Sequence, residues 1–244
     1  MPPYQIVRSK MEKTRALLSD PVLARYIPKT ELYSPDNLKK MLSDYSLVYV
    51  KPDRGSGGGR VISIGLKASK LCRVHYETKI QQDLTMEAVH SFIAGIAGGD
   101  RFIIQQGIKL LTIDGKPVDL RIHLQRPYSR WEVTGWLVKI AAPGKAVTNR
   151  RRGGKLVDFN TALLRAGLNK SSIVKTANRL SYLCSRTAFV LNRRYAGLRE
   201  LGVDIALDQN ARPWILEVNT RPEFPRGNRI VDRYHEIIVR KKRI

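Results

Sequence analysis

Two carboxylates and one amide near the end of the chain have the types and spacing of a cation-binding site. Glu217 and Asn219 are two residues apart in a segment rich in Trp, Ile and Val, so a β-strand there would project both side chains from one face. Asp204 lies in the preceding apolar segment, and the turn residues 208–211 predict a hairpin that brings it beside the other two. Hard oxygen donors of this kind suit Mg²⁺ or Mn²⁺ and leave coordination positions for water and phosphate.

The charge of the chain favours the metal site over the ordinary alternative, a hairpin with a few acidic residues on its solvated face. Lys and Arg number 44 against 21 Asp and Glu, for a net charge of +23, so acidic residues within an apolar hairpin are unusual here. The same excess of positive charge indicates an anionic partner, which could be a nucleotide, a nucleic acid, an acidic peptide or an anionic polymer.

A glycine-rich loop joins two predicted strands, 47–50 and 61–64, and begins directly after Lys51. Its small residues are Gly55, Ser56, Gly57, Gly58 and Gly59. A Walker loop requires a helix after it, so this loop instead suits a flap whose backbone N–H groups close over phosphates, with cations beside it. The alternative is an ordinary glycine-rich hairpin turn.

A buried strand is predicted over residues 101–108, and it runs into Gly107. The side chains at its end are Gln105, Gln106 and Ile108. We expect this strand end to be the hinge between two lobes, where a purine could bond to backbone groups.

Further cations lie on later predicted strands and in one loop. Arg121 and Lys139 belong to two adjacent strands and are expected to face the same cleft, although a cation on a strand is more often simply solvated. The basic loop 148–155 contains Asn149 and Arg152 and has the composition of an anion-binding loop or of a solvated charge run.

The remaining patterns indicate a globular protein of one large domain or two small ones. Helices are predicted over 9–19, 34–44, 85–97, 171–196 and 230–244, the last with a basic end. Cys72 and Cys184 have no metal or disulfide spacing and suit two buried thiols. No apolar run approaches the roughly 20 residues that span a bilayer, so we expect a cytoplasmic protein with no membrane partner.

In their order along the chain, the motifs resemble those of the ATP-grasp superfamily, and within it those of the YheC/YheD-type proteins associated with bacterial spore coats. The matching motifs are Lys-Pro-x-x-Gly-Ser, Gln-Gln-Gly-Ile, Asp-Leu-Arg, Trp-Glu-Val-Thr-Gly, Thr-Asn-Arg-Arg-Arg-Gly-Gly and Glu-Val-Asn-Thr-Arg-Pro. The resemblance implies an α+β fold in which two lobes hold ATP between them. It also implies a single ATP-grasp domain over residues 1–244: a helical N-terminal segment to about 45, a smaller lobe over about 46–106, and a larger lobe over about 107–244 with a basic C-terminal helix.

The resemblance further implies an ATP- and Mg²⁺-dependent ligase, in which a substrate carboxylate takes the γ-phosphate and an amine or similar nucleophile then displaces it. The implied ATP-binding residues are Lys10, Lys51, Gly55, Ser56, Gly57, Gly58, Gly59, Gln105, Gln106 and Ile108. The implied catalytic residues are Arg121, Lys139, Asn149 and Arg152, and the implied metal ligands are Asp204, Glu217 and Asn219.

The sequence departs from the family pattern in three respects. Arg60 replaces the usual last glycine of the flap, Lys139 replaces a common arginine, and the chain begins almost at the ATP-grasp core without a separate preceding domain. The missing acceptor surface could come from a homo-oligomer or an accessory protein. Two alternatives therefore stay open: an ATP-binding structural or regulatory spore-associated protein without turnover, and a nucleic-acid or anionic-polymer binding protein. The second ranks last because no nucleic-acid motif is present.

Overall fold

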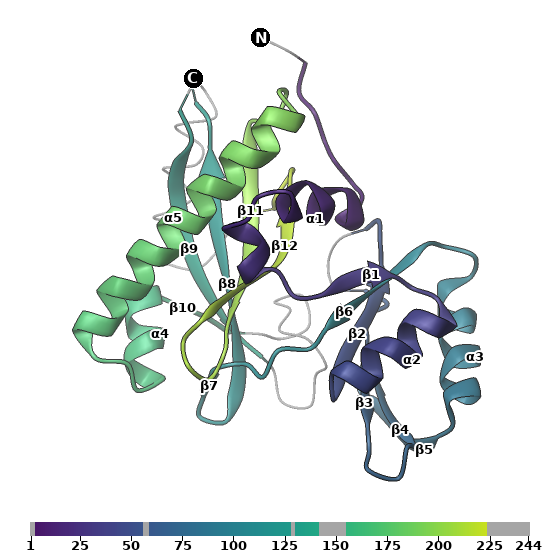
Figure 1. The fold of residues 1–244 in the computed structure, drawn as a ribbon. Helices are drawn as coiled ribbons and strands as arrows, with labels where there is room; N and C mark the ends of the chain where they lie inside the picture. Colours follow the sequence, from purple (N-terminus) through teal and green to yellow (C-terminus); the bar gives the residue numbers. More distant parts are fainter. Residues whose placement is uncertain (1–2, 56–58, 128–129, 142–154, 224–244) are drawn as a thin grey trace.

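The computed structural model describes residues 3–55, 59–127, 130–141 and 155–223, which form two α+β lobes (Figure 1). The predicted helix 230–244 and most of the basic loop 148–155 lie outside the described residues. No helix within the described ranges is long and apolar enough to cross a membrane.

The smaller lobe is an antiparallel six-stranded sheet covered by two helices. Its strand order is β1 (Thr30–Leu32), β6 (Phe102–Gln106), β2 (Leu47–Pro52), β3 (Ile62–Leu66), β4 (Cys72–Tyr76) and β5 (Lys79–Leu84). Helices α2 (Pro35–Asp44) and α3 (Met86–Ala97) pack onto it through residues such as Leu38, Met41 and Ile93. The expected helix starts are confirmed, since the side chains of Ser34 and Thr85 each accept a hydrogen bond from a first-turn N–H.

The larger lobe is built on a second antiparallel sheet. Its main strand order is β10 (Lys155–Val157), β9 (Glu132–Ile140), β8 (Lys116–Gln125), β11 (Glu200–Leu207) and β12 (Pro213–Asn219), and the short β7 (Thr112–Ile113) pairs with β8. Helices α1 (Lys10–Leu18), α4 (Phe159–Arg165) and α5 (Lys170–Arg194) all contribute side chains to the apolar core of this lobe.

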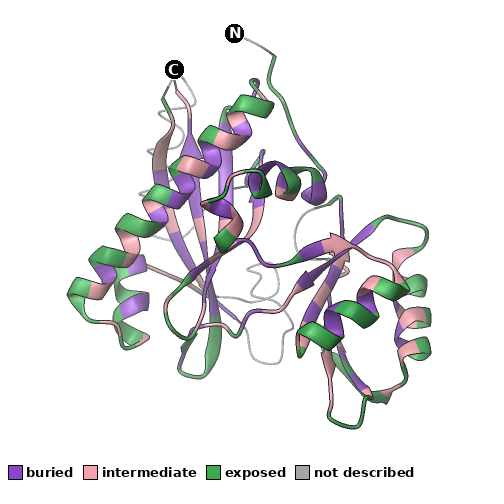
Figure 2. Ribbon diagram, viewed as in Figure 1, coloured by how far each residue is buried: buried purple, intermediate pink, exposed green. Residues whose placement is uncertain are grey.

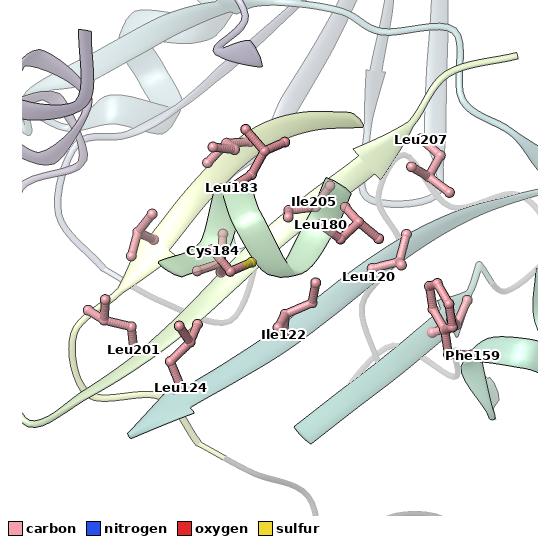
Figure 3. Close-up of a cluster of buried hydrophobic side chains, with 14 of the residues drawn as sticks. Leu120, Ile122, Leu124, Phe159, Leu180, Leu183, Cys184, Leu201, Ile205 and Leu207 are labelled. Carbon is pink, nitrogen blue, oxygen red and sulfur yellow. The ribbon is translucent and has the colours of Figure 1, made fainter. Parts of the chain in front are cut away.

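Alternation along the strands gives the larger sheet one apolar and one polar face. On β8, Leu120, Ile122 and Leu124 are buried beneath α5, whose Leu180, Leu183 and Cys184 pack against them (Figure 3). The intervening residues of β8 therefore point to the other side of the sheet, away from α5. The polar face of the sheet is consequently available for chemistry while the apolar face holds the lobe together.

The first 45 residues divide between the two lobes. Helix α1 and the 3₁₀ helix η1 (Leu23–Tyr26) supply Leu17 and Leu23 to the core of the larger lobe, whereas β1 and α2 complete the smaller one. The segment expected to be a helical N-terminal part thus also contains a strand.

Within the described residues the chain crosses between the lobes after η1 and again after β6. At the second crossing the N–H of Gly107 donates to the carbonyl of Leu47 at 2.8 Å. A Cβ on residue 107 would lie only 2.5 Å from the Leu47 side chain, so the close approach of the two strands requires glycine here.

Residues 4–7 bind along the end of the larger sheet. The N–H of Gln5 donates to the carbonyl of Gly197 at 3.0 Å, and the N–H of Val7 donates to Thr220 Oγ1 at 2.9 Å. The hydroxyl of Tyr4 donates to the carbonyl of Thr220 at 3.2 Å. The start of the chain is therefore fixed to residues about 200 positions later.

Candidate active site

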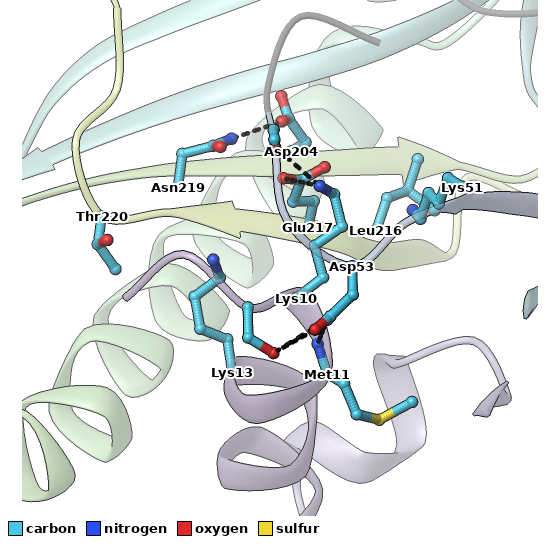
Figure 4. Close-up of polar contacts among 12 residues, drawn as sticks. Lys10, Met11, Lys13, Lys51, Asp53, Asp204, Leu216, Glu217, Asn219 and Thr220 are labelled. Carbon is cyan, nitrogen blue, oxygen red and sulfur yellow. Dashed lines mark hydrogen bonds and ion pairs between the residues drawn. The ribbon is translucent and has the colours of Figure 1, made fainter. Parts of the chain in front are cut away.

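The three predicted oxygen donors lie together on the polar face of the larger sheet (Figure 4). The hairpin of β11 and β12 pairs Asp204 with Glu217, and Gly202 with Asn219. The amide Nδ2 of Asn219 donates to Asp204 Oδ2 at 3.1 Å, which leaves its Oδ1 as an acceptor. The sequence-based placement of the hairpin and of these side chains agrees with the structure.

Two cations, one on β8 and one on β9, balance the charge of Asp204. Arg121 donates from Nε and Nη2 to the two oxygens of Asp204 at 2.5 and 2.7 Å, and Lys139 Nζ lies 3.4 Å from Oδ1. Lys139 also lies 2.9 Å from Asp119 Oδ1. Arg121 and Lys139 therefore share one face, as expected from the alternation of their strands.

The electrostatics of this cluster favour the charged forms. Burial by itself would raise the pKa of Asp204, but the charges of Arg121 and Lys139 hold that pKa below its usual value. Burial likewise opposes the charge of Arg121 and Lys139, yet the neighbouring carboxylates keep both of their pKa values above the usual range. The cluster is thus a fixed, nearly balanced set of charges rather than a group of titrating residues.

Glycine at position 202 makes room for Arg121. A Cβ there would lie 2.7 Å from Pro222 Cβ and 3.1 Å from Arg121 Cδ. Any larger residue would press on the side chain that binds Asp204.

The smaller lobe contributes Lys51 from β2. Its Nζ donates to Gln105 Oε1 at 2.8 Å, and Gln105 Nε2 donates in turn to Thr30 Oγ1 at 3.0 Å and to the carbonyl of Leu216 at 3.4 Å. Burial lowers the pKa of Lys51, while the attraction of Glu217 opposes that shift. Gln105 therefore connects Lys51 of one lobe to β12 of the other.

Residues 106 and 108 occupy the second crossing between the lobes. Gln106 Oε1 accepts from the N–H of Lys29 at 3.2 Å, and Ile108 is buried. Their predicted place between the two lobes agrees with the structure, whereas a hinge motion and contact with a purine stay predictions.

Lys10 links the start of the glycine-rich loop to the predicted metal ligands. It lies on α1, donates from Nζ to the carbonyl of Gly55 at 2.9 Å, and lies 3.6 Å from Glu217 Oε1 (Figure 4). Gly55 has a φ of 115°, a value that glycine adopts readily and other residues rarely do. Gly59 is described, whereas Ser56, Gly57, Gly58, Asn149 and Arg152 lie outside the described residues.

Sequence reasoning missed Asp53, which fixes the position of Lys10. This fully buried carboxylate accepts from Ser9 Oγ at 2.9 Å, from the N–H of Met11 at 2.8 Å and from Arg101 Nη2 at 2.8 Å. It therefore attaches the first turn of α1 to the smaller lobe. The only sequence signal was an acidic residue directly after a strand in a basic loop.

Lys13 is a second missed residue. It is buried on α1, donates to the carbonyl of Val7 at 2.8 Å, and lines a small pocket together with Lys10 and Glu217. Burial lowers its pKa to about 8, against the opposing attraction of Glu217. A lysine on a short, polar helix gives no sequence signal of burial.

The comparisons with known proteins give the family. A model described as YheC/D like ATP-grasp matches residues 4–241. The chain belongs to the YheC/D-like ATP-grasp family. The family resemblance inferred from the motif order is thereby confirmed.

Two relatives of this YheC/D-like protein come from Bacillus subtilis (strain 168). The endospore coat-associated protein YheD is 28% identical over 221 residues, which cover 88% of this chain and 48% of YheD. The endospore coat-associated protein YheC is 24% identical over 205 residues, which cover 82% of this chain and 56% of YheC. The chain thus spans about half the length of the curated relatives it matches.

Among solved structures, D-cycloserine synthetase DcsG resembles this YheC/D-like chain with a TM-score of 0.58 at 12% identity. The match covers 97% of this chain and 70% of DcsG. At that identity the likeness shows the fold alone, and it confirms the expected α+β ATP-grasp architecture with its two sheets.

The residues of the YheC/D-like site fit a hard divalent cation. The described part of the chain contains no group of three or more His, Cys, Asp or Glu side chains that could hold a metal. The site instead offers two carboxylates and an amide oxygen, Asp204, Glu217 and Asn219. That donor set suits Mg²⁺, which commonly binds one or two carboxylates and completes its shell with water and substrate phosphates.

Proposed function

We propose that this protein is an ATP- and Mg²⁺-dependent ligase that joins a carboxylate to an amine or a similar nucleophile through an acyl phosphate. The observation that carries the proposal is the convergence of four cations and three oxygen donors at one place. Lys51 comes from the smaller lobe, Lys10 from α1, and Arg121 and Lys139 from the polar face of the larger sheet. Phosphoryl transfer depends mainly on such positioning and charge neutralisation.

The proposed roles of the individual residues are those that the ATP-grasp resemblance implies. Lys10 and Lys51 bind ATP phosphates or base, and the loop from Gly55 to Gly59 covers the phosphates and excludes water from the acyl phosphate. Arg121 and Lys139 neutralise the transferring phosphoryl group. A Mg²⁺ ion held by Asp204, Glu217 and Asn219 would supply further neutralisation of phosphate charge. Asn149 and Arg152 complete the phosphate or acceptor site in this proposal, and Gln105, Gln106 and Ile108 line the adenine site.

Asp204 is expected to couple the binding of Mg²⁺ to the binding of ATP. Its carboxylate is engaged by Arg121 and Lys139, which are also the proposed phosphate-binding cations. Arg121 and Lys139 would leave Asp204 on binding ATP phosphates, and Asp204 would leave both cations on binding Mg²⁺. Mg²⁺ and ATP are therefore expected to bind cooperatively, each raising the affinity of the other.

Calorimetric titration tests the binding step. We would titrate Mg-ATP into the wild type and into an Asp204→Ala, Glu217→Ala double variant. The matched control is an Asp83→Ala, Asp100→Ala variant, which makes the same change in net charge at exposed side chains, 59% and 61% accessible. The proposal predicts binding in the wild type and control and its loss or strong weakening in the site variant. No binding in the wild type, or equal loss in the control, would refute it.

Release of ADP tests turnover. Small carboxylates and amines, then acidic peptides, would be supplied in pairs with Mg-ATP, because the net charge of +23 favours an acidic acceptor. ADP release that requires both the carboxylate and the amine supports the ligase proposal. Binding of Mg-ATP without ADP release on any acceptor would support a structural or regulatory ATP-binding role instead.

We also propose that the protein is cytoplasmic until it associates with the endospore coat, on the likeness to YheD and YheC. Imaging of a fluorescent fusion during sporulation tests this. A fusion that stays diffuse in the cell throughout sporulation contradicts the proposal.

A further inference from the structure

The outer side of α5 carries an exposed apolar stripe that the candidate active site does not use. Val174, Tyr182 and Phe189 are 58%, 53% and 59% exposed. They are eight and seven residues apart, which on an α-helix places them within an arc of about 80°, so they project from one side of the helix over about 22 Å. Figure 2 shows exposed positions along α5, whose inner side packs on the sheet. The stripe therefore faces away from the polar face where ATP is proposed to bind.

The charge of α5 has one sign only. Its 25 residues contain six Lys or Arg and no Asp or Glu. Lys175, Arg179 and Arg193 are exposed beside the stripe. The Arg193 guanidinium carbon lies 5.8 Å from the centre of the Phe189 ring, and Arg186 Nη1 donates to the Tyr182 hydroxyl at 3.3 Å. The aromatic residues are thus flanked by cations.

This combination indicates what could cover the surface. Tyr and Arg are enriched among the residues that dominate binding energy at protein interfaces, and a row of cations selects carboxylates. A second copy pairing through its own α5 would bring cation against cation. Single-stranded nucleic acid usually binds in a basic groove with free aromatic faces for stacking. Here the surface is a convex helix, Arg193 lies over the Phe189 ring, and Val174 has no stacking face.

We propose that the outer face of α5 docks an acidic amphipathic helix of another protein. Apolar side chains of that helix would pack on Val174, Tyr182 and Phe189, and its carboxylates would pair with Lys175, Arg179 and Arg193. The seven-residue spacing of Tyr182 and Phe189 equals the heptad repeat of an apolar seam on a partner helix. The proposal does not depend on ATP binding, because α5 lies on the opposite face of the sheet.

A designed peptide is the probe. It has about 20 residues, enough to cover the stripe, with Leu at heptad positions a and d and with Glu and Ala elsewhere. Its fluorescence anisotropy would be measured with the full chain, next to a scrambled peptide of the same composition and a single-stranded oligonucleotide of about the same length. The test variant is Tyr182→Ala, Phe189→Ala, which leaves every charge in place. The control variant is Ile80→Ala, which removes an exposed apolar side chain from β5.

We expect the patterned peptide to bind the wild type and the control variant, and to bind the test variant at least about tenfold more weakly. Circular dichroism and Mg-ATP titration should not differ between the test variant and the wild type, which separates a docking defect from misfolding. Absence of peptide binding, equal binding of the scrambled peptide, or equal binding by both variants would overturn the proposal. Tighter binding of the oligonucleotide, lost in the test variant, would overturn it in favour of a nucleic-acid surface.

Discussion

Substitution of Asp204 by Asn is the sharpest perturbation of the site without added ligand. The change is isosteric and removes the negative charge that Arg121 binds at 2.5 and 2.7 Å. In this variant Lys139 retains its ion pair with Asp119, whose Oδ1 lies 2.9 Å from Lys139 Nζ. Among the described residues, no second carboxylate lies comparably close to Arg121. The variant therefore removes the one carboxylate that is hydrogen-bonded to the buried Arg121 guanidinium, and leaves only the more distant charges of Glu217 and Asp119.

The size of the effect follows from the burial of the pair. The side chains of Arg121 and Asp204 are 19% and 14% exposed, so the pair is mostly but not completely removed from water. Breaking a buried pair by removing one partner costs about 3–5 kcal/mol, and partial exposure lowers our expectation to about 2–3 kcal/mol of unfolding free energy. Because the folded pKa of Asp204 is lowered, this contribution is present above the unfolded pKa of about 3.9 and is lost as the pH falls through the folded pKa.

Urea unfolding at neutral pH, followed by tryptophan fluorescence, measures this difference. All three tryptophans, Trp131, Trp136 and Trp214, lie in the larger lobe and report on the lobe that contains the pair. An Arg121→Met, Asp204→Asn double variant is the control, since it removes the uncompensated charge and should recover more than half of the lost stability. A loss below about 1 kcal/mol, or a double variant no more stable than Asp204→Asn, would refute the reasoning.

Three further predictions concern residues that surround the site. The first compares the wild type with Lys13→Met: the unfolding free energy of the wild type should rise by about 3 kcal/mol relative to that of the variant between about pH 8 and pH 10.5, because the unfolded wild-type chain binds more protons than the folded one in that window. Urea unfolding across that pH range measures the difference, and a difference that does not change with pH contradicts the prediction. Asp53→Asn should lower the unfolding free energy by about 1–3 kcal/mol, because the first turn of α1 and Arg101 lose a charged acceptor; a matched Asp83→Asn change at an exposed site should have little effect. Gly202→Ala should cost about 1–3 kcal/mol through contact with Pro222 and Arg121, and should weaken Mg-ATP binding; calorimetry and urea unfolding that match the wild type would disprove it.

The strands and helices with strong patterns could be predicted from the sequence. The 204–219 hairpin has alternating residues and a clear turn, and α2 and α3 have capping residues at their starts, so local signals and tertiary packing agree there. Strand β5 gave only a weak signal because its residues are nearly all exposed, and no alternation of buried and exposed residues marks it. Its pairing with β4 is a tertiary contact that composition does not show.

The candidate site was predictable where strand geometry places side chains, and not where a helix end crosses between lobes. Arg121, Lys139 and Asp204 lie on three neighbouring strands, and alternation is enough to bring them to one face. The contacts of Lys10 and Asp53 join residues more than 40 positions apart through the first turn of α1. Nothing in the local sequence indicates which charges will be buried at such a junction.

The attachment of the chain's start to residues 197–220 has a consequence for how the protein forms during synthesis. The smaller lobe is nearly contiguous in sequence, from β1 to β6, so its core can assemble once the ribosome has released about residue 106. In the larger lobe, by contrast, the segment before α1 cannot make its native contacts until β12 has left the ribosome, because the N–H of Val7 donates to the hydroxyl of Thr220, 213 residues later. Contacts of such sequence separation close slowly, so residues 4–18 should stay exposed to proteases and chaperones until β12 has been released from the ribosome.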